Sequence, residues 1–384
     1  MNTEGLLFLL LRSEFCSDVK EAITVPPSED DLKALYTLSK MHDVAHIISN
    51  ALQKRGLLGK DEASKKFSNA QLVSIYRCEQ LKYTFNEICS AFEKEKIPYI
   101  PLKGLLLRQY YPEEWMRTSC DIDVLVHDED MKRASNALVE IGYKTDNKRH
   151  FHDMSLYSPN GIHLELHFNI KENMGNIDGL LSEVWEFSRR ERGEGFRYDL
   201  TKEFFVFHHI AHMSYHFVSG GCGIRPFIDL FVMKRNMGYD DIAVRSYCRQ
   251  CGIEKFYENV LSVVNVWFGG ETHSPISQKI EDYILKGGVY GTLENRVLVA
   301  QTRQGGKLKY ILSRLFMPYG ALKNYYPILN KHKWLFPFMQ VGRWIRFFIK
   351  GSFKRGLKEI KLNQNIEKEQ AESTTAFLNE VGLL

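Results

Sequence analysis

The sequence predicts an α+β fold in which a small β-sheet lies between two helical regions. Apolar residues recur at helical spacing before residue 96 and again after residue 171, whereas short extended segments fill the stretch between them. The 384 residues exceed one ordinary domain, so we expect more than one folded unit. We therefore divide the chain into an N-terminal helical region (1–95), an α/β core (96–170) and a C-terminal helical domain (171–384).

The N-terminal region carries two helix signals. After the break at Pro26 and Pro27, Ser28 can cap a helix because Asp31 follows three residues later. A second, long helix is expected over residues 69–96, where apolar side chains recur at three- and four-residue steps.

The α/β core is punctuated by proline, glycine and capping residues, which allow the order of its elements to be predicted. Pro159-Asn160-Gly161 predicts a hairpin turn because glycine accepts positive φ. In chain order we expect an extended segment at 97–102, a short helix at 105–110, a strand at 121–127, a helix at 129–141 begun by Asp128, and strands at 153–157 and 162–168.

The C-terminal region is expected to be helical again. Helices are predicted over residues 201–217 and 226–236, joined by the glycine-rich stretch 219–223, which we expect to be a flexible connection. Residues 363–384 indicate a polar tail with a weakly helical end.

Composition and charge are those of a soluble globular protein. Hydrophobic residues make up 44%, charged residues 26%, and the net charge is only +4, which does not indicate nucleic acid or a membrane as a partner. Seven scattered cysteines, an odd number, favour a reducing, cytoplasmic setting. The single Cys248-x-x-Cys251 pair cannot fill a four-ligand zinc site. No secretory signal is predicted, since an acidic residue precedes the apolar stretch 6–11 and no small-residue cleavage site follows it. No membrane span is predicted either, since no apolar run approaches 18 residues.

Asp121 and Asp123 stand one residue apart at the start of a predicted strand. Side chains alternate along a strand, so both carboxylates share one face, roughly 7 Å apart, while Ile122 and Val124 face a core. Like charges on one face repel each other, and a cation between them removes that repulsion. Mg²⁺ prefers such oxygen ligands and keeps positions for phosphate. The alternative is a solvated strand end at which both aspartates face water.

The segment GIHLELHFNI, residues 161–170, places Glu165 in the middle of an apolar strand. A carboxylate in such a strand needs a partner. If this strand lies beside the Asp121 strand, Glu165 becomes the third carboxylate of a two-metal phosphoryl-transfer site. His163 and His167 share its face and would then support the metal ligands. The alternative is a pair of solvent-exposed histidines on an edge strand.

These residues carry a family resemblance. Over roughly residues 95–240 the chain resembles the uncharacterised nucleotidyltransferase family of the DNA polymerase β-like superfamily. The resemblance lies in the stretch PLKGLLLRQYYPEEWMRTSCDIDVLV and, further along the chain, in GIHLELHFNI. The resemblance implies a small mixed β-sheet of the polymerase β-like type, with an Asp-x-Asp strand and a third acid on a following strand. By position it implies that Asp121, Asp123 and Glu165 are catalytic and bind metal. The implied cofactor is Mg²⁺, with Mn²⁺ as an alternative.

The glycine motif of that superfamily falls on Lys103-Gly104, where Gly-Ser is the common form. This chain has no serine hydroxyl at that point, so Lys103 would replace it by charge beside the amides of a helix start. Arg117, four residues before Asp121, can bind phosphate bidentately. The resemblance thus implies nucleotide binding by Lys103, Gly104 and Arg117. The alternative for Lys103 is an exposed lysine before a turn, and the alternative for Arg117 is a salt bridge within the loop.

His208, His212 and His216 recur every four residues on one predicted helix face. The spacing resembles that of metal-binding helices, but the outer two lie about 12 Å apart and cannot share an ion with the middle one. We expect the row to line a cleft or to pack against aromatic neighbours. His212 and Asp229 also match the helical region of the family, which implies that both are cleft residues.

The stretch GRWIRFFIKGSFKRGLKEIKL, residues 342–362, is basic and aromatic. An amphipathic helix that packs its aromatic face on the domain is the ordinary interpretation. Contact with a membrane surface or nucleic acid is the alternative.

The leading hypothesis is a Mg²⁺-dependent nucleotidyltransferase. It would transfer a nucleoside monophosphate from an NTP, most simply ATP, to a hydroxyl acceptor on a small molecule, a sugar, a protein or an RNA end. One alternative is a catalytically weak nucleotide-binding or protein-interaction module on the same fold. A second is a membrane- or RNA-associated partner protein that uses residues 342–362.

Overall fold

The computed structural model describes residues 2–16, 26–149, 152–191, 195–289, 291–349 and 353–384. Its N-terminal part is helical, and Ser28 caps the second helix as predicted, with the Ser28 hydroxyl accepting from the Asp31 amide and the Asp31 carboxylate accepting from the Ser28 amide. The long fourth helix begins earlier than expected because Asp61 caps it. These helices are α1 (Thr3–Phe15), α2 (Glu29–Met41), α3 (Ala45–Lys54) and α4 (Glu62–Lys94).

Five strands form one mixed sheet in the order β1-β2-β5-β4-β3, which confirms the predicted α+β fold with a small mixed sheet. β2 and β5 run parallel, and all other neighbours in this sheet run antiparallel. The strands are β1 (Tyr99–Pro101), β2 (Asp121–Val126), β3 (Lys144–Arg149), β4 (Asp153–Tyr157) and β5 (His163–His167). A separate two-stranded ribbon pairs β6 (Ser188–Arg190) with β7 (Tyr198–Leu200).

The alternation predicted for β2 fixes which way its aspartates point. Ile122, Val124 and Val126 belong to a buried cluster with α4 and α6 (Met131–Glu140). Leu125 belongs instead to the larger cluster on the other face of the sheet. Asp121 and Asp123 share the face of Leu125, since side chains two residues apart point the same way.

The predicted hairpin between β4 and β5 is confirmed. Gly161 has φ +76°, and the Ser158 amide donates to the Ile162 carbonyl oxygen at 2.9 Å. β3 was not predicted, because this edge strand has the polar sequence KTDNKR and no apolar alternation that would indicate a strand.

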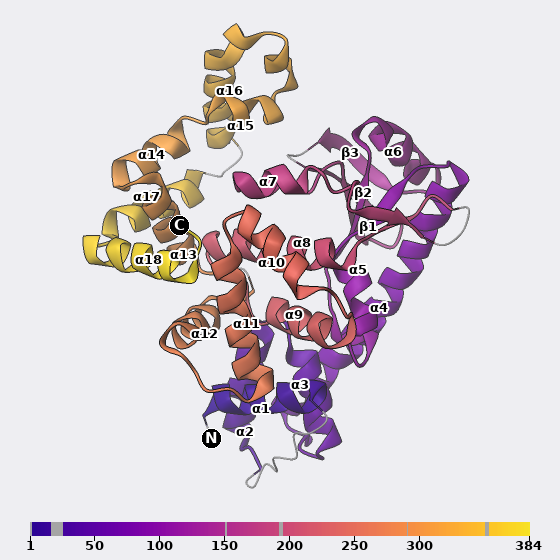
Figure 1. The fold of residues 1–384 in the computed structure, drawn as a ribbon, viewed down its shortest axis with the longest axis vertical. Coiled ribbons are helices and arrows are strands. Elements are labelled where there is room, and N and C mark those ends of the chain that lie inside the picture. The colour runs from indigo at the N-terminus through magenta and orange to yellow at the C-terminus, as the bar shows by residue number, and fades with distance from the viewer. Residues whose placement is uncertain (1, 17–25, 150–151, 192–194, 290, 350–352) are drawn as a thin grey trace.

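Helices dominate the rest of the chain, as predicted. Figure 1 shows the sheet on one side of the molecule, α13 to α18 on the other, and α8 to α11 between them. The helices are α5 (Gly104–Leu107), α7 (Asn176–Leu181), α8 (Lys202–Val218), α9 (Arg225–Asn236), α10 (Asp241–Gln250), α11 (Glu254–Gly269), α12 (Pro275–Gly287), α13 (Leu293–Gln304), α14 (Lys307–Leu315), α15 (Tyr319–Tyr325), α16 (Phe336–Ile349), α17 (Phe353–Asn365) and α18 (Lys368–Val381).

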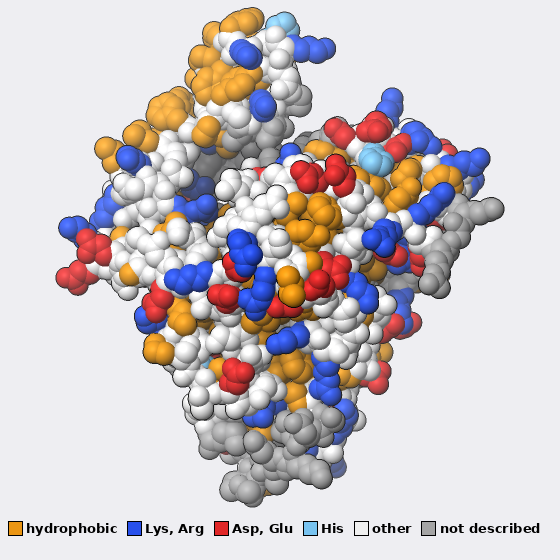
Figure 2. All heavy atoms as spheres, viewed as in Figure 1, with side chains coloured by type: hydrophobic (Ala, Val, Ile, Leu, Met, Phe, Trp, Pro, Cys, Tyr) orange, Lys and Arg blue, Asp and Glu red, His pale blue; other side chains and the backbone are white. Residues whose placement is uncertain are grey.

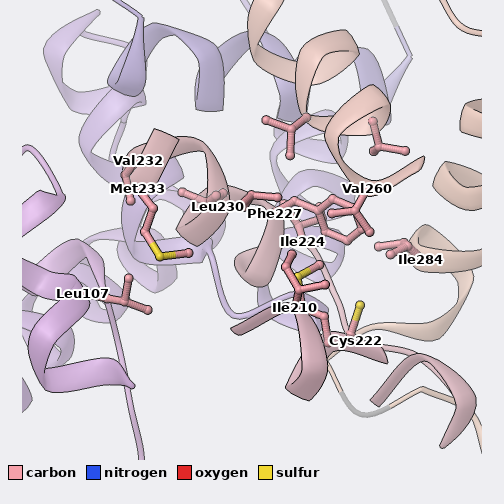
Figure 3. Packing of buried hydrophobic residues seen from close by; sticks show 14 of the residues in the cluster. Leu107, Ile210, Cys222, Ile224, Phe227, Leu230, Val232, Met233, Val260 and Ile284 are labelled. Carbon is pink, nitrogen blue, oxygen red and sulfur yellow. The ribbon is translucent and has the colours of Figure 1, made fainter. Parts of the chain in front are cut away.

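The larger hydrophobic core joins both helical regions. It contains side chains of α1, α2 and α3 together with side chains of α8 to α12. Figure 3 shows Ile210, Phe227, Val260 and Ile284, from four different helices, meeting in this core. The division of the chain at residues 95 and 170 stays a prediction.

The glycine-rich stretch 219–223 packs tightly, which differs from the loose connection expected. Gly220, Gly221 and Gly223 have positive φ. A Cβ on Gly221 would lie 3.0 Å from Gly291 Cα, so only glycine lets these two backbones approach.

One expectation for the C-terminus is wrong. The predicted polar tail is largely the helix α18, and its Leu378 and Val381 are fully buried in the larger core. Of the stretch 342–362, residues 342–349 lie in α16 and residues 353–362 in α17, while residues 350–352 lie outside the described residues. Its packing as one amphipathic helix on the domain stays a prediction. No helix among the described residues is long and apolar enough to cross a membrane.

Candidate active site

β2 and β5 lie side by side, which is the arrangement that Glu165 needs in order to join Asp121 and Asp123 as a third carboxylate. Their register pairs Asp123 with Glu165 and Asp121 with His163. Atoms of Asp123, Glu165 and His167 that can bind metal all lie within 4.8 Å of one another, and the same holds for Asp121, His163 and Glu165. The two groups share Glu165, so the three predicted carboxylates form one continuous acidic site.

The electrostatics of this site separate the two aspartates. Burial and the neighbouring carboxylates of Asp123 and Glu165 raise the pKa of Asp121 to about 6. Burial also disfavours the charged form of Asp123, but the Lys103 ammonium and the hydrogen bond from His167 hold its pKa well below the usual range. Asp121 therefore carries the like-charge strain that was predicted for the pair, whereas Asp123 is compensated.

His167 is buried and fixed between two carboxylates. Its Nε2 lies 2.9 Å from Asp123 Oδ1 and 3.5 Å from Glu165 Oε2. Burial opposes a charged imidazole, but these hydrogen bonds raise the pKa of His167 to about 9. His163 lies further from Glu165, at 4.0 Å, and its Nε2 lies 3.0 Å from Ser155 Oγ. The alternative of an edge strand is wrong, because β5 lies between β2 and β4.

Lys103 enters the acidic site from the turn between β1 and α5. The Leu102 amide donates to the Asp123 carbonyl oxygen at 3.0 Å, which holds this turn against β2. Lys103 itself has φ +45° and ψ −112°, a sparsely populated conformation for a residue with a side chain. Burial opposes its charge, but Asp123, Glu172, Glu165 and Asp121 together raise its pKa.

Gly104 lies beside a hydroxyl that the sequence did not reveal. A Cβ at this position would meet Ser119 Cβ at 3.4 Å, which is an ordinary contact. Ser119 Oγ donates to the Asp121 carbonyl oxygen at 3.0 Å and accepts from Arg108 Nη2 at 2.9 Å. A serine hydroxyl is thus present near the glycine motif, although it comes from a different segment of the chain.

A cavity of about 680 Å³ opens in front of the carboxylates. Asp121, Asp123, Glu165 and Lys103 line this cavity, and so do side chains of α8. The α8 side chains that line the cavity are Phe205, His208, His209, His212, Met213, Tyr215 and His216. The prediction that the histidine row lines a cleft agrees with this arrangement.

The α8 histidines form a hydrogen-bonded chain with a buried glutamate. His212 Nδ1 lies 2.6 Å from Glu172 Oε1, and His212 Nε2 lies 2.9 Å from His216 Nε2. Burial and the Lys103 ammonium hold the pKa of His212 well below its usual range and lower that of His216 to about 4. Glu172 was missed, because no spacing pattern in the sequence links it to residue 212.

Arg117 and Asp229 form a buried ion pair at the edge of the cavity. Arg117 Nε lies 2.6 Å from Asp229 Oδ1, the Tyr111 hydroxyl donates to the same oxygen at 2.6 Å, and Arg117 Nη1 donates to the Thr118 carbonyl oxygen. Burial disfavours the Asp229 carboxylate, but Arg117 lowers its pKa. Two of the three guanidinium nitrogens are thus used within the protein, and phosphate binding by Arg117 stays a prediction.

The fold and this site describe a nucleotidyltransferase-type domain, and comparison with known families agrees. A family model described as uncharacterised nucleotidyltransferase matches residues 28–269, more than half of the chain. The protein therefore belongs to this uncharacterised nucleotidyltransferase family. No curated protein and no solved structure matches it. The match spans α2 to α11 and ends before α12.

Proposed function

We propose that the protein is a divalent-metal-dependent nucleotidyltransferase that moves a nucleoside monophosphate from an NTP to a hydroxyl acceptor. The observation that carries this proposal is the meeting of three carboxylates and one lysine at the wall of a single cavity. The preferred NTP is ATP, the metal is Mg²⁺ or Mn²⁺, and the acceptor is a small molecule, a sugar, a protein or an RNA end.

The donor set fits such a metal. Asp121, Asp123 and Glu165 offer carboxylate oxygens, the ligands that Mg²⁺ and Mn²⁺ prefer. Burial and the carboxylates of Asp123 and Glu165 raise the pKa of Asp121, and a bound cation would favour its charged form. The bound ions would neutralise the charge that develops on the transferring phosphoryl group.

The other residues of the cavity position the reactants. Lys103 would hold the triphosphate, and Gly104 and Arg117 would lie along the same phosphates. Glu165 would accept the proton of the acceptor hydroxyl as that oxygen bonds to the α-phosphorus. The bond between the α-phosphorus and its bridging oxygen would then break, and pyrophosphate would leave. Most of the rate enhancement would come from positioning and charge neutralisation.

The altered glycine motif favours a second candidate, a catalytically weak nucleotide-binding or protein-interaction module. Lys103-Gly104 replaces the common Gly-Ser, and the hydroxyl of Ser119 is already engaged by Arg108 and Asp121. Such a module would bind Mg²⁺-NTP without turnover. Because the seven cysteines are odd in number and scattered without a framework pattern, we propose a reducing, cytoplasmic setting for either function.

Nucleotide binding tests both candidates first. The melting temperature of the wild type should rise with Mg²⁺ and at least one of the four NTPs. Lys103→Ala should weaken that NTP by about tenfold to a hundredfold, in line with ~1.5–3 kcal/mol for one charge-assisted contact. Lys132→Ala, at an exposed position of α6 that does not line the cavity, is the matched control. A wild type that shows no shift with any NTP would exclude the metal-site interpretation.

A further inference from the structure

Charge is distributed very unevenly along the chain. Residues 295–358 contain 14 Lys and Arg residues and no Asp or Glu. The rest of the chain therefore holds 37 basic and 47 acidic residues and carries a net charge of −10. This basic segment covers α13 to α16 and the start of α17, and it lies outside the residues that match the family.

The same segment exposes large apolar side chains in two stripes. Leu308, Leu312 and Leu315 follow one another at helical steps on α14, and Leu308 is 70% exposed. Trp334, in the turn just before α16, and Phe338 on α16 are 68% and 63% exposed and begin a second stripe. Nine of the twenty large hydrophobic side chains that are exposed among the described residues lie in this segment, namely Leu308, Leu312, Leu315, Phe316, Ile328, Trp334, Phe338, Val341 and Ile345.

These two helices are held together, so the exposed stripes belong to a built surface. Trp344 Nε1 on α16 donates to the Leu315 carbonyl oxygen at 2.7 Å, and Arg343 Nη2 donates to the Arg314 carbonyl oxygen at 3.2 Å. The rings of Phe316 and Trp344 meet edge to face with their centroids 5.5 Å apart. Figure 2 shows hydrophobic side chains gathered over this part of the molecule, with Lys and Arg among them. We name the surface of α14 to α16 the basic apolar face.

We propose that the basic apolar face binds an anionic lipid surface. Exposed Lys307, Lys309, Lys331, Lys333 and Arg346 would contact the headgroups, because basic side chains are attracted to the negative potential of such a surface. The leucine and aromatic stripes would enter the boundary between headgroups and acyl chains, as the apolar side of an interfacial helix does. The negative remainder of the molecule would be repelled, which turns the basic apolar face toward the lipid.

Charge and residue type favour lipid over two other occupants. Single-stranded nucleic acid stacks on aromatic rings, which gives no role to the three exposed leucines of α14. A second copy of the same face would bring two strongly basic surfaces together without an acidic partner between residues 295 and 358. A lipid surface satisfies both the positive charge and the apolar stripes.

Vesicle co-sedimentation of the full chain tests the proposal, independently of nucleotidyl transfer. The wild type should sediment with vesicles that contain phosphatidylglycerol, and much less with vesicles of phosphatidylcholine alone or at high salt. Lys331→Glu/Lys333→Glu and Trp334→Ser/Phe338→Ser should each lower the partition coefficient about tenfold or more. Ile242→Ser removes an apolar side chain on α10 that is 79% exposed, and it should bind like the wild type.

Three outcomes would overturn the proposal. The first is a wild type that does not sediment with anionic vesicles. The second is binding of single-stranded RNA, but not vesicles, that the charge-reversal variant abolishes. The third is a wild-type dimer in size-exclusion chromatography that the Trp334→Ser/Phe338→Ser variant converts to a monomer, without vesicle binding by either. All variants change exposed side chains, and unchanged melting temperatures would confirm that they fold.

Discussion

Asp121 and Asp123 are one residue apart and yet experience opposite electrostatic environments. The sequence predicted their shared face from strand alternation, which depends only on local geometry. It could not show that Lys103 and His167 both compensate Asp123 while Asp121 stays strained, because those contacts join segments distant along the chain. The pairing of Asp123 with Glu165 was likewise an assumption until the register of β2 and β5 was known.

The different electrostatic environments of Asp121 and Asp123 predict that replacing each by asparagine changes the free energy of unfolding in opposite directions. At pH 7 without metal, Asp121→Asn should raise the free energy of unfolding by about 1–3 kcal/mol, because the raised pKa of Asp121 makes its charged form unfavourable in the fold. The gain should vanish below about pH 4, where the aspartate is protonated in both states. Asp123→Asn should destabilise the protein, since His167 and Lys103 lose their partner.

Urea unfolding of the two variants at pH 7 and pH 4 measures these effects. Equal changes in both variants would contradict the assignment of strain to Asp121.

The buried pair of Arg117 and Asp229 predicts a large loss of stability. Asp229 is 1% exposed, and Asp229→Asn leaves the Arg117 charge without its partner. We expect a loss of about 3–5 kcal/mol, the usual effect of breaking a buried ion pair. Glu254→Gln, which breaks the exposed pair with Arg249, is the control and should change stability far less. A similar effect of both substitutions on chemical unfolding would mean that Arg117 is not held by Asp229 in solution.

Helices, strands and turns with a clear local signal could be predicted from the sequence, whereas those that depend on tertiary contacts could not. The hairpin at Gly161, the cap at Ser28 and the strand β2 each have a local signal, and each is confirmed. β3 is polar, and it forms because β4 offers it an edge to pair with. α18 has few apolar residues, but its Leu378 and Val381 are buried in the larger core.

The close approach of the loop 219–223 to Gly291 can be tested for its contribution to stability. Gly221→Ala would place a Cβ 3.0 Å from Gly291 Cα at φ +137°, so we expect a loss of about 2 kcal/mol or more. Gly56→Ala is the matched control, because Gly56 has φ +65° but no atom within 4 Å of the added Cβ. It should lose only about 1 kcal/mol from the backbone conformation. Equal losses in thermal or urea unfolding would show that the close approach to Gly291 contributes nothing.

For the whole molecule, burial of neutral histidines predicts sensitivity to acid. Burial lowers the pKa of His42 and of His216 to about 4, and it lowers the pKa values of His46, His208, His209 and His212. An unfolded histidine binds its proton near pH 6.5, so between pH 6.5 and 4 the unfolded chain holds protons that the folded chain lacks. Stability should therefore fall as the pH decreases through this window, by about 1.4 kcal/mol per unit for each such histidine.

His42 isolates one of these contributions, because it lies in the turn after α2 and does not line the cavity. The free energy of unfolding of His42→Gln should depend on pH less steeply than that of the wild type, by about one proton between pH 6 and 5. The measurement is urea unfolding at both pH values. Parallel lines for the two proteins would show that His42 titrates normally in the fold.

Nucleotide transfer by the acidic site can be measured by following a labelled phosphate from the NTP to an acceptor. Wild type, Glu165→Gln and Asp123→Asn are incubated with Mg²⁺ and each NTP, labelled on the α- or the γ-phosphate, in the presence of cell lysate as a source of acceptors. We expect the wild type to pass the α-label to an acceptor, while the γ-label leaves with pyrophosphate. Glu165→Gln should still bind NTP but transfer ~10²–10⁴-fold more slowly, as expected for loss of a general base. Binding of Mg²⁺-NTP by the wild type without transfer of α-label would contradict nucleotidyl transfer by this site. Transfer by Glu165→Gln at the wild-type rate would contradict the role of Glu165 as general base.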